Sequence, residues 1–160
     1  MSHNNFSYSN KGLALTKHFE GLRLSAYQDS VGVLTIGYGH TGSSVHPGMT
    51  ITEQQATELL LQDVTGAVAA VNRLVTVPVD QDQFDALVDF VYNVGAGNFA
   101  RSTLLRELNA GNIAAAAAQF PQWGCAGGVK LPGLLRRRLS EQALFQTSGV
   151  PPNPPQYLHR

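Results

Sequence analysis

A change in the spacing of apolar residues near the N-terminus constrains the fold of this 160-residue chain more than any other feature. Leu13, Leu15 and Phe19 recur at helical spacing, and Gly21 is typical of a residue that ends a helix. From residue 33 to residue 38, apolar and polar residues alternate among glycines, which predicts short strands joined by tight turns. The sequence therefore predicts a helix followed directly by a β-hairpin.

Two acidic residues lie at the two sides of this transition. Glu20 falls in the last turn of the predicted helix, and Asp29 falls in the first turn of the predicted hairpin. Thr35 lies on the returning strand, where its hydroxyl can share a water molecule with Asp29. Cleavage of a glycosidic bond needs one carboxyl group that protonates the leaving oxygen and a second group that supplies or steers the nucleophile. The competing interpretation is a solvated glutamate and an aspartate that only forms a turn.

The residues around these acids resemble the phage-type lysozymes, the endolysins of glycoside hydrolase family 24. The resemblance covers roughly residues 12–146 and begins with Glu20, Asp29 and Thr35 at the spacing of that family. Several separated motifs in one order are more specific than any single motif. The further matching segments are Gly37-Tyr38-Gly39-His40, Tyr92-Asn93-Val94-Gly95, Ser102-Thr103-Leu104-Leu105, Leu108-Asn109-Ala110-Gly111, Trp123 and Arg137-Arg138.

This resemblance implies peptidoglycan hydrolysis between N-acetylmuramic acid and N-acetylglucosamine, which leads to bacterial lysis. Glu20 would be the general acid, and Asp29 with Thr35 would hold the attacking water. Direct attack by Asp29 is the alternative, and the resemblance favours inversion. A lytic transglycosylase would use the same acid without a held water, and a murein-binding module would keep the fold without the chemistry.

Six other residues have expected roles, five of them implied by the resemblance. Tyr92, Ser102 and Thr41 match positions that contact the saccharide in relatives, although the residue type at position 41 differs from theirs. His40 matches a histidine that pairs with a helix aspartate, here Asp63. Arg136, Arg137 and Arg138 point in different directions on a helix, and one of the three, with Arg137 favoured, is expected to face the cleft and anchor a carboxylate. No metal or other cofactor is expected. The nine expected site residues are thus Glu20, Asp29, Thr35, His40, Thr41, Asp63, Tyr92, Ser102 and Arg137.

The predicted fold class is α+β and lysozyme-like, with a mostly helical lobe, a small hairpin lobe and a catalytic cleft between them. A single domain is expected over residues 1–149, followed by a Pro-rich tail at 150–160. Within the domain, the β lobe takes residues 21–51, and a linking helix at 52–72 is expected to be the spine across which the lobes open. The helical lobe takes residues 73–149 together with the N-terminal helix.

Local signals predict the remaining helices. Asp80 with Gln83 caps a buried central helix that ends at Gly95, and Ser102 or Thr103 opens a short helix that ends near residue 111. Asn112 is expected to cap a helix over 113–120, and the last helix starts at Pro132-Gly133.

Composition limits the other classes of function. Eleven basic and eleven acidic residues leave no net charge, which argues against a nucleic-acid binder. The single cysteine, Cys125, cannot form an intramolecular disulfide and is expected to be a small packed residue. The N-terminus has no basic start followed by an apolar run, so neither a signal peptide nor stable membrane association is expected. We therefore expect a monomer made in the host cytoplasm that reaches periplasmic murein after a separate holin has opened the membrane.

Overall fold

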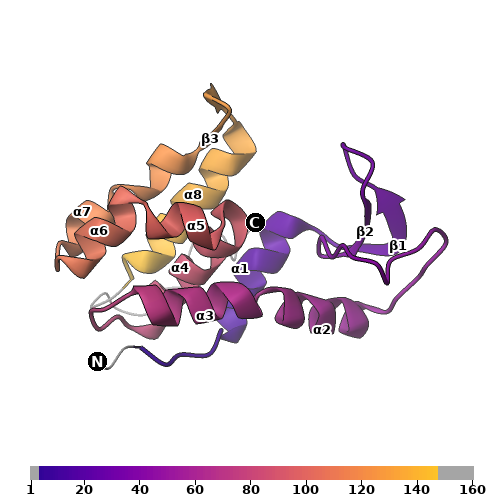
Figure 1. Ribbon diagram of the computed structural model, residues 1–160, viewed down its shortest axis with the longest axis horizontal. Helices are drawn as coiled ribbons and strands as arrows, with labels where there is room; N and C mark the ends of the chain where they lie inside the picture. Colours follow the sequence, from indigo (N-terminus) through magenta and orange to yellow (C-terminus); the bar gives the residue numbers. More distant parts are fainter. Residues whose placement is uncertain (1–3, 148–160) are drawn as a thin grey trace. The chain divides into compact units, whose positions relative to one another are not determined.

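The computed structural model describes residues 4–147, so the predicted tail at 150–160 and the predicted domain end at 149 lie outside the described residues. The fold is mostly helical with a small two-stranded hairpin, which confirms the predicted α+β class (Figure 1). The chain forms two compact units. The hairpin unit contains Thr16–Thr65, and the helical unit combines Met1–Leu15 with Gly66–Arg160.

The hairpin unit follows the sequence pattern closely. Helix α1, Asn10–Glu20, ends where Gly21 takes a positive φ of 75° and donates its N–H to the Lys17 carbonyl at 3.0 Å. Strands β1, Arg23–Gln28, and β2, Leu34–Gly37, then pair antiparallel. Helix α2, Glu53–Asp63, begins at the capping box formed by Thr52 and Gln55. These elements confirm the predicted helix end and hairpin.

The single long helix predicted at 52–72 is wrong, because the chain forms two helices there. Helix α2 ends at Asp63, and helix α3 runs over Thr65–Leu74. Between them Val64 has a ψ of −7°, far from the helical value near −42°. The Thr65 hydroxyl donates to the Gln62 carbonyl at 2.7 Å, a side-chain bond that bends helices, and the weak helix former Gly66 follows. The boundary between the two units falls just after this break, between Thr65 and Gly66.

The helical unit is organised around helix α4, Gln81–Val94, which begins at the Asp80 capping box. Residues 83–91 of this helix are all buried, as predicted for a central helix. The Phe90 ring lies edge-on to those of Phe99, Phe120 and Trp123, at centroid distances of 6.2, 5.4 and 5.5 Å. Trp123 thus packs in the aromatic core. The other elements are α5 (Ala96–Ala100), α6 (Thr103–Asn109), α7 (Ile113–Ala117), the 3₁₀ helix η1 (Phe120–Trp123), β3 (Cys125–Ala126), β4 (Val129–Lys130) and α8 (Pro132–Phe145).

Two local expectations in this unit need correction. Helix α7 ends at Ala117 rather than at residue 120, and the Asn112 side chain does not cap it. Instead, the Asn112 amide donates to Glu107 Oε1 at 2.8 Å, and the chain tightens into η1 around Pro121. Cys125 is exposed rather than packed, because it lies on the short β3–β4 hairpin, whose four strand residues are all exposed.

Buried charges fasten α8 to α4. Arg137 donates from Nε and Nη2 to the two oxygens of Asp89, each at 2.9 Å, and both side chains are buried. Arg138 Nη2 donates to Glu141 Oε2 at 3.0 Å, and burial lowers the pKa of Arg138. Burial also raises the pKa of Glu141 well above its ordinary value, with nearby Asp89 adding to the shift.

Candidate functional site

Asp29 organises the turn between β1 and β2. Its carbonyl accepts the Gly32 N–H at 3.0 Å, and Gly32 has a positive φ of 86°, the pattern of a three-residue hairpin loop with a bulge. The side-chain oxygen Oδ1 accepts the N–H groups of Val31 and Val33, both at 2.9 Å. Its other oxygen, Oδ2, has no hydrogen-bond partner among residues 4–147. Asp29 therefore forms the turn and still offers one carboxylate oxygen.

Thr35 lies on β2 on the same face of the hairpin as Asp29. It pairs with Tyr27, and Asp29 lies two residues beyond Tyr27, so the alternation of side chains puts all three on one face. The Thr35 side chain is 4% exposed, and its hydroxyl donates to the Val33 carbonyl at 2.9 Å. The hydroxyl is therefore fixed in direction, with its lone pairs left to accept hydrogen bonds.

Glu20 is the last residue of α1 and is half-buried. Its Oε1 lies 3.0 Å from the position that a Cβ atom would take on Gly39. Gly39 has a positive φ of 87° and belongs to the tight turn in which Ile36 and His40 exchange two main-chain hydrogen bonds, of 2.9 and 2.8 Å. A side chain at position 39 would meet the carboxylate, so the glycine permits the close approach of this turn to Glu20.

His40 and Asp63 are paired as the resemblance implies. His40 Nδ1 lies 2.8 Å from Asp63 Oδ2 and 3.1 Å from Oδ1, which ties the end of the β2 turn to the last residue of α2. The pair is in the hairpin unit, as are Glu20, Asp29 and Thr35. Thr41, which follows His40, is exposed in the same unit.

The other expected site residues belong to the helical unit. Tyr92 is half-buried on α4, and Arg137 is buried against Asp89. Ser102 is 5% exposed and caps α6, because its hydroxyl accepts the Leu105 N–H at 3.0 Å and donates to the Phe99 carbonyl at 2.7 Å. Ser102 thus begins α6, as the sequence predicted. The saccharide contacts expected of Tyr92, Ser102 and Thr41 stay predictions.

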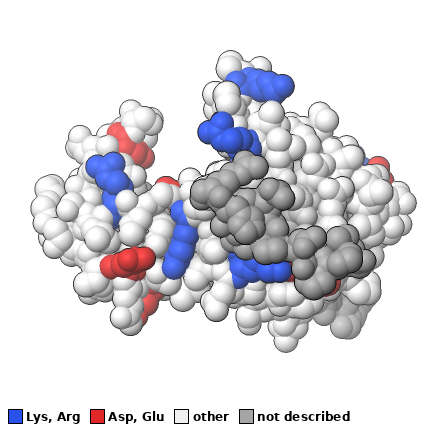
Figure 2. Space-filling model, turned by 180° about the vertical axis from the view of Figure 1, so that it is seen from behind, with Lys and Arg blue, Asp and Glu red and all other residues white. Residues whose placement is uncertain are grey.

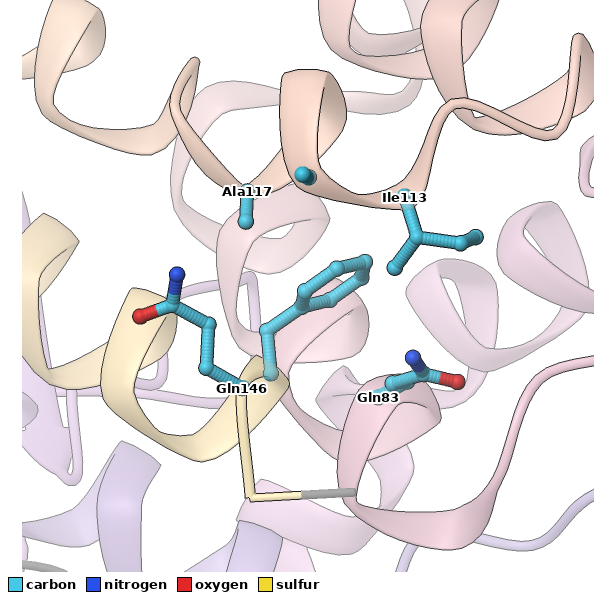
Figure 3. A pocket seen from close by; sticks show the side chains of 6 residues that line it. Gln83, Ile113, Ala117 and Gln146 are labelled. Carbon is cyan, nitrogen blue, oxygen red and sulfur yellow. The ribbon is translucent and has the colours of Figure 1, made fainter. Parts of the chain in front are cut away.

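A pocket of about 400 Å³ lies elsewhere in the helical unit (Figure 3). It opens between the start of α4, helix α7 and the end of α8, and no expected site residue lines it. Within residues 4–147, no group of three His, Cys, Asp or Glu side chains is arranged to hold a metal ion. The same part of the chain has no helix with the length and apolar character to span a bilayer. On the face shown in Figure 2, basic and acidic side chains are scattered between uncharged areas rather than gathered into one basic patch.

Sequence reasoning missed the part that Val33 plays between Asp29 and Thr35. The Val33 N–H, as described, bonds the Asp29 side chain, while its carbonyl accepts both the Asp29 N–H and the Thr35 hydroxyl. The Asp-Ser-Val-Gly order of residues 29–32 signals the turn, because Asp favours the first position of a type I turn and Gly its fourth, but it does not signal the main-chain bonds of Val33.

Comparison with known proteins gives a family match over most of the chain. The phage lysozyme family matches residues 17–141. An endolysin of Bacillus phage PZA is 51% identical over 91% of this chain, and an endolysin of Salmonella phage P22 is 48% identical over 86% of it. The alignments span 57% of the former protein and 96% of the latter, so the chain covers little more than half the length of the Bacillus phage relative.

A solved structure of an endolysin from Escherichia coli O157:H7 phage FAHEc1 has the same fold. It superposes with a TM-score of 0.85 at 41% identity, covering 94% of this chain and 99% of the other. Both the sequence match and the structural match extend over the hairpin unit and the helical unit. The chain belongs to the phage lysozyme family.

Proposed function

We propose that the chain is a peptidoglycan hydrolase, a lysozyme of the N-acetylmuramidase type (EC 3.2.1.17), that cleaves the β-1,4 bond between N-acetylmuramic acid and N-acetylglucosamine and so lyses bacteria. The observation that carries the proposal is the hairpin geometry. Asp29 keeps one oxygen outside its turn, and Thr35 lies on the same face with its hydroxyl already oriented. Membership of the phage lysozyme family supports the same activity.

In the proposed reaction, Glu20 donates its proton to the glycosidic oxygen as the bond from that oxygen to the anomeric carbon breaks. A water held by Asp29 and Thr35 attacks the opposite face of the anomeric carbon, and its surplus proton passes to Asp29. One water is consumed for each bond cleaved, and the configuration of the anomeric carbon inverts. The protein itself supplies every group used, so the reaction needs no cofactor.

Digestion of purified murein tests this function. We expect new reducing ends, and mass spectrometry should find muramyl products heavier by one water than anhydro-muramyl products. Anhydro ends without new reducing ends would instead identify a lytic transglycosylase. Binding to the wall without any cleavage would identify a murein-binding module.

The substrate and the route to it form part of the same proposal. Peptidoglycan is the expected partner of a monomeric enzyme made in the host cytoplasm, and a separate holin is expected to give access to the periplasmic wall. Induction of the gene in bacteria with and without a holin gene tests this dependence. Lysis at the same rate in both strains would contradict it.

A further inference from the structure

The main-chain groups of Val33 connect Asp29 and Thr35. Its N–H donates to Asp29 Oδ1, and its carbonyl accepts two hydrogen bonds, one from the Asp29 N–H and one from the Thr35 hydroxyl. All three distances are 2.9 Å. A carbonyl oxygen has two lone pairs and can accept both donors at once. One residue thus fixes the direction of both polar side chains.

These bonds decide which way each side chain can interact with a water molecule. The Thr35 hydroxyl has a single proton, and Val33 already accepts it, so that hydroxyl can only accept a bond from a water. An ionised Asp29 carboxylate is also only an acceptor. A water between Thr35 and Asp29 would therefore donate both of its protons, which leaves its lone pairs free.

The hairpin register leaves room for one such water. Asp29 and Thr35 are diagonal neighbours on one face of an antiparallel pair, where backbone positions are about 7–8 Å apart. Two hydrogen bonds of about 2.8 Å through one water can connect side chains that extend into such a gap. Thr35 is also β-branched and buried, so its side chain has little freedom to turn the hydroxyl away.

We propose that Val33 is a positioning residue for hydrolysis, whose peptide groups turn Asp29 and Thr35 into two acceptors that orient the attacking water. This inference rests on the proposed function. It assigns no substrate contact to the Val33 side chain. Because the effect comes from main-chain atoms, ordinary side-chain substitutions at this position would not remove it.

Replacement of single amides by esters tests the proposal. Incorporation of the hydroxy-acid analogue of valine at position 33 removes the N–H that bonds Asp29 and leaves every side chain unchanged. The hydroxy-acid analogue of leucine at position 34 turns the Val33 carbonyl into an ester carbonyl, which is a weaker acceptor. The matched control is the ester at Ala26, whose N–H bonds the Met49 carbonyl at 2.9 Å in the same unit. All three proteins lose one main-chain donor in or beside the hairpin.

The readout is the separation of kcat from KM on purified murein, with thermal melting as the check on folding. We expect the esters at 33 and 34 to lower kcat about tenfold relative to the Ala26 ester, the equivalent of about 1.4 kcal/mol, with KM and melting temperature close to those of the control. Equal kcat values in the three ester proteins would overturn the positioning role. A wild-type protein that releases no reducing ends would refute the proposed function instead, so the two failures are distinguishable.

Discussion

Local backbone geometry helps to position the two acidic residues of the candidate site. Asp29 is fixed by two amide donors of its own turn, and Glu20 by the end of α1 opposite Gly39. The proposed roles differ between the two acids, because Glu20 donates a proton and Asp29 holds the attacking water. Substitution of Glu20 gives the clearer test.

We expect Glu20→Gln to abolish murein cleavage while the protein still folds, because glutamine cannot give a proton to the leaving oxygen. A general acid contributes about a hundredfold to ten-thousandfold in rate. The release of reducing ends measures the loss, and circular dichroism checks the fold. Glu58→Gln is the control, because Glu58 is an exposed carboxyl group on α2. Retention of about a tenth of the wild-type rate would represent a loss of only about 1.4 kcal/mol and would exclude Glu20 as the acid.

A second residue-scale prediction concerns Asp85, which is completely buried on α4. Burial raises its pKa above the ordinary value of 3.8, although hydrogen bonds from Ser9 and Gln81 oppose the shift. A raised folded-state pKa means that the stabilising contribution is complete below the unfolded pKa and is lost as the pH rises through the folded pKa. The ionised carboxylate therefore weakens the folded state near neutral pH.

Asp85→Asn should accordingly gain stability relative to wild type as the pH rises from about 3 to about 7. The measurement is the free energy of unfolding in urea at several pH values. Ser9→Ala should behave in the opposite way, because it removes a donor that favours the ionised carboxylate. If the difference between Asp85→Asn and wild type does not change with pH, the raised pKa is refuted.

At the scale of elements, the sequence predicted helix starts that are fixed by residues close together in the chain. Asp80 with Gln83 forms the expected capping box, because the two side chains that complete it are only three residues apart. The order Asp-Ser-Val-Gly likewise predicted the turn after β1. The helix end at Glu20 and the turn at Asp29 were therefore readable from the sequence, and the catalytic roles of these two residues stay predictions.

The wrong predictions at 52–72 and at Asn112 have one cause, which is a side-chain hydrogen bond that the residue pattern does not reveal. The apolar spacing over 52–72 continues through Val64, and only the bond from the Thr65 hydroxyl to Gln62 shows why the helix stops there. Asn112 had the right residue type for a cap, but Glu107 captures its side chain. The link through Val33 uses main-chain atoms, which every residue type possesses, so residue identity alone could not reveal it.

The start of α6 offers a test of these capping interactions. We expect Ser102→Ala to lower the free energy of unfolding by about 1–2 kcal/mol, because it leaves the buried Leu105 N–H without its acceptor. Thr52→Ala removes an exposed cap of the same kind from α2 and is the matched control. Urea denaturation measures both losses, and an unchanged stability in Ser102→Ala would contradict the capping role. A KM for murein that rises in Ser102→Ala but not in Thr52→Ala would also support the saccharide contact of Ser102 that the family resemblance implies.

At the scale of the whole molecule, the two units are joined within α1, between Leu15 and Thr16, and at the start of α3, between Thr65 and Gly66. The second junction is locally weak in its helical bonding because Thr65 and Gly66 both disfavour a continuous helix. The sequence predicted that the two lobes open across the segment at 52–72. We expect bending at this junction to allow that opening, so that a polymeric substrate can enter.

Replacement of both junction residues tests this expectation. Gly66 has no neighbouring atoms within 4 Å of an added Cβ and no positive φ, so the double variant Thr65→Ala/Gly66→Ala fits the backbone. It should favour one continuous helix and raise the free energy of unfolding by about 1 kcal/mol. If cleavage needs the junction to bend, the variant should hydrolyse whole murein several-fold more slowly than wild type, yet cleave short muropeptide oligosaccharides at the wild-type rate. Gly133→Ala, at the start of α8, controls for a stabilising change away from the junction. Equal rates on whole murein for the junction variant, this control and wild type would show that bending at Val64 plays no part in catalysis.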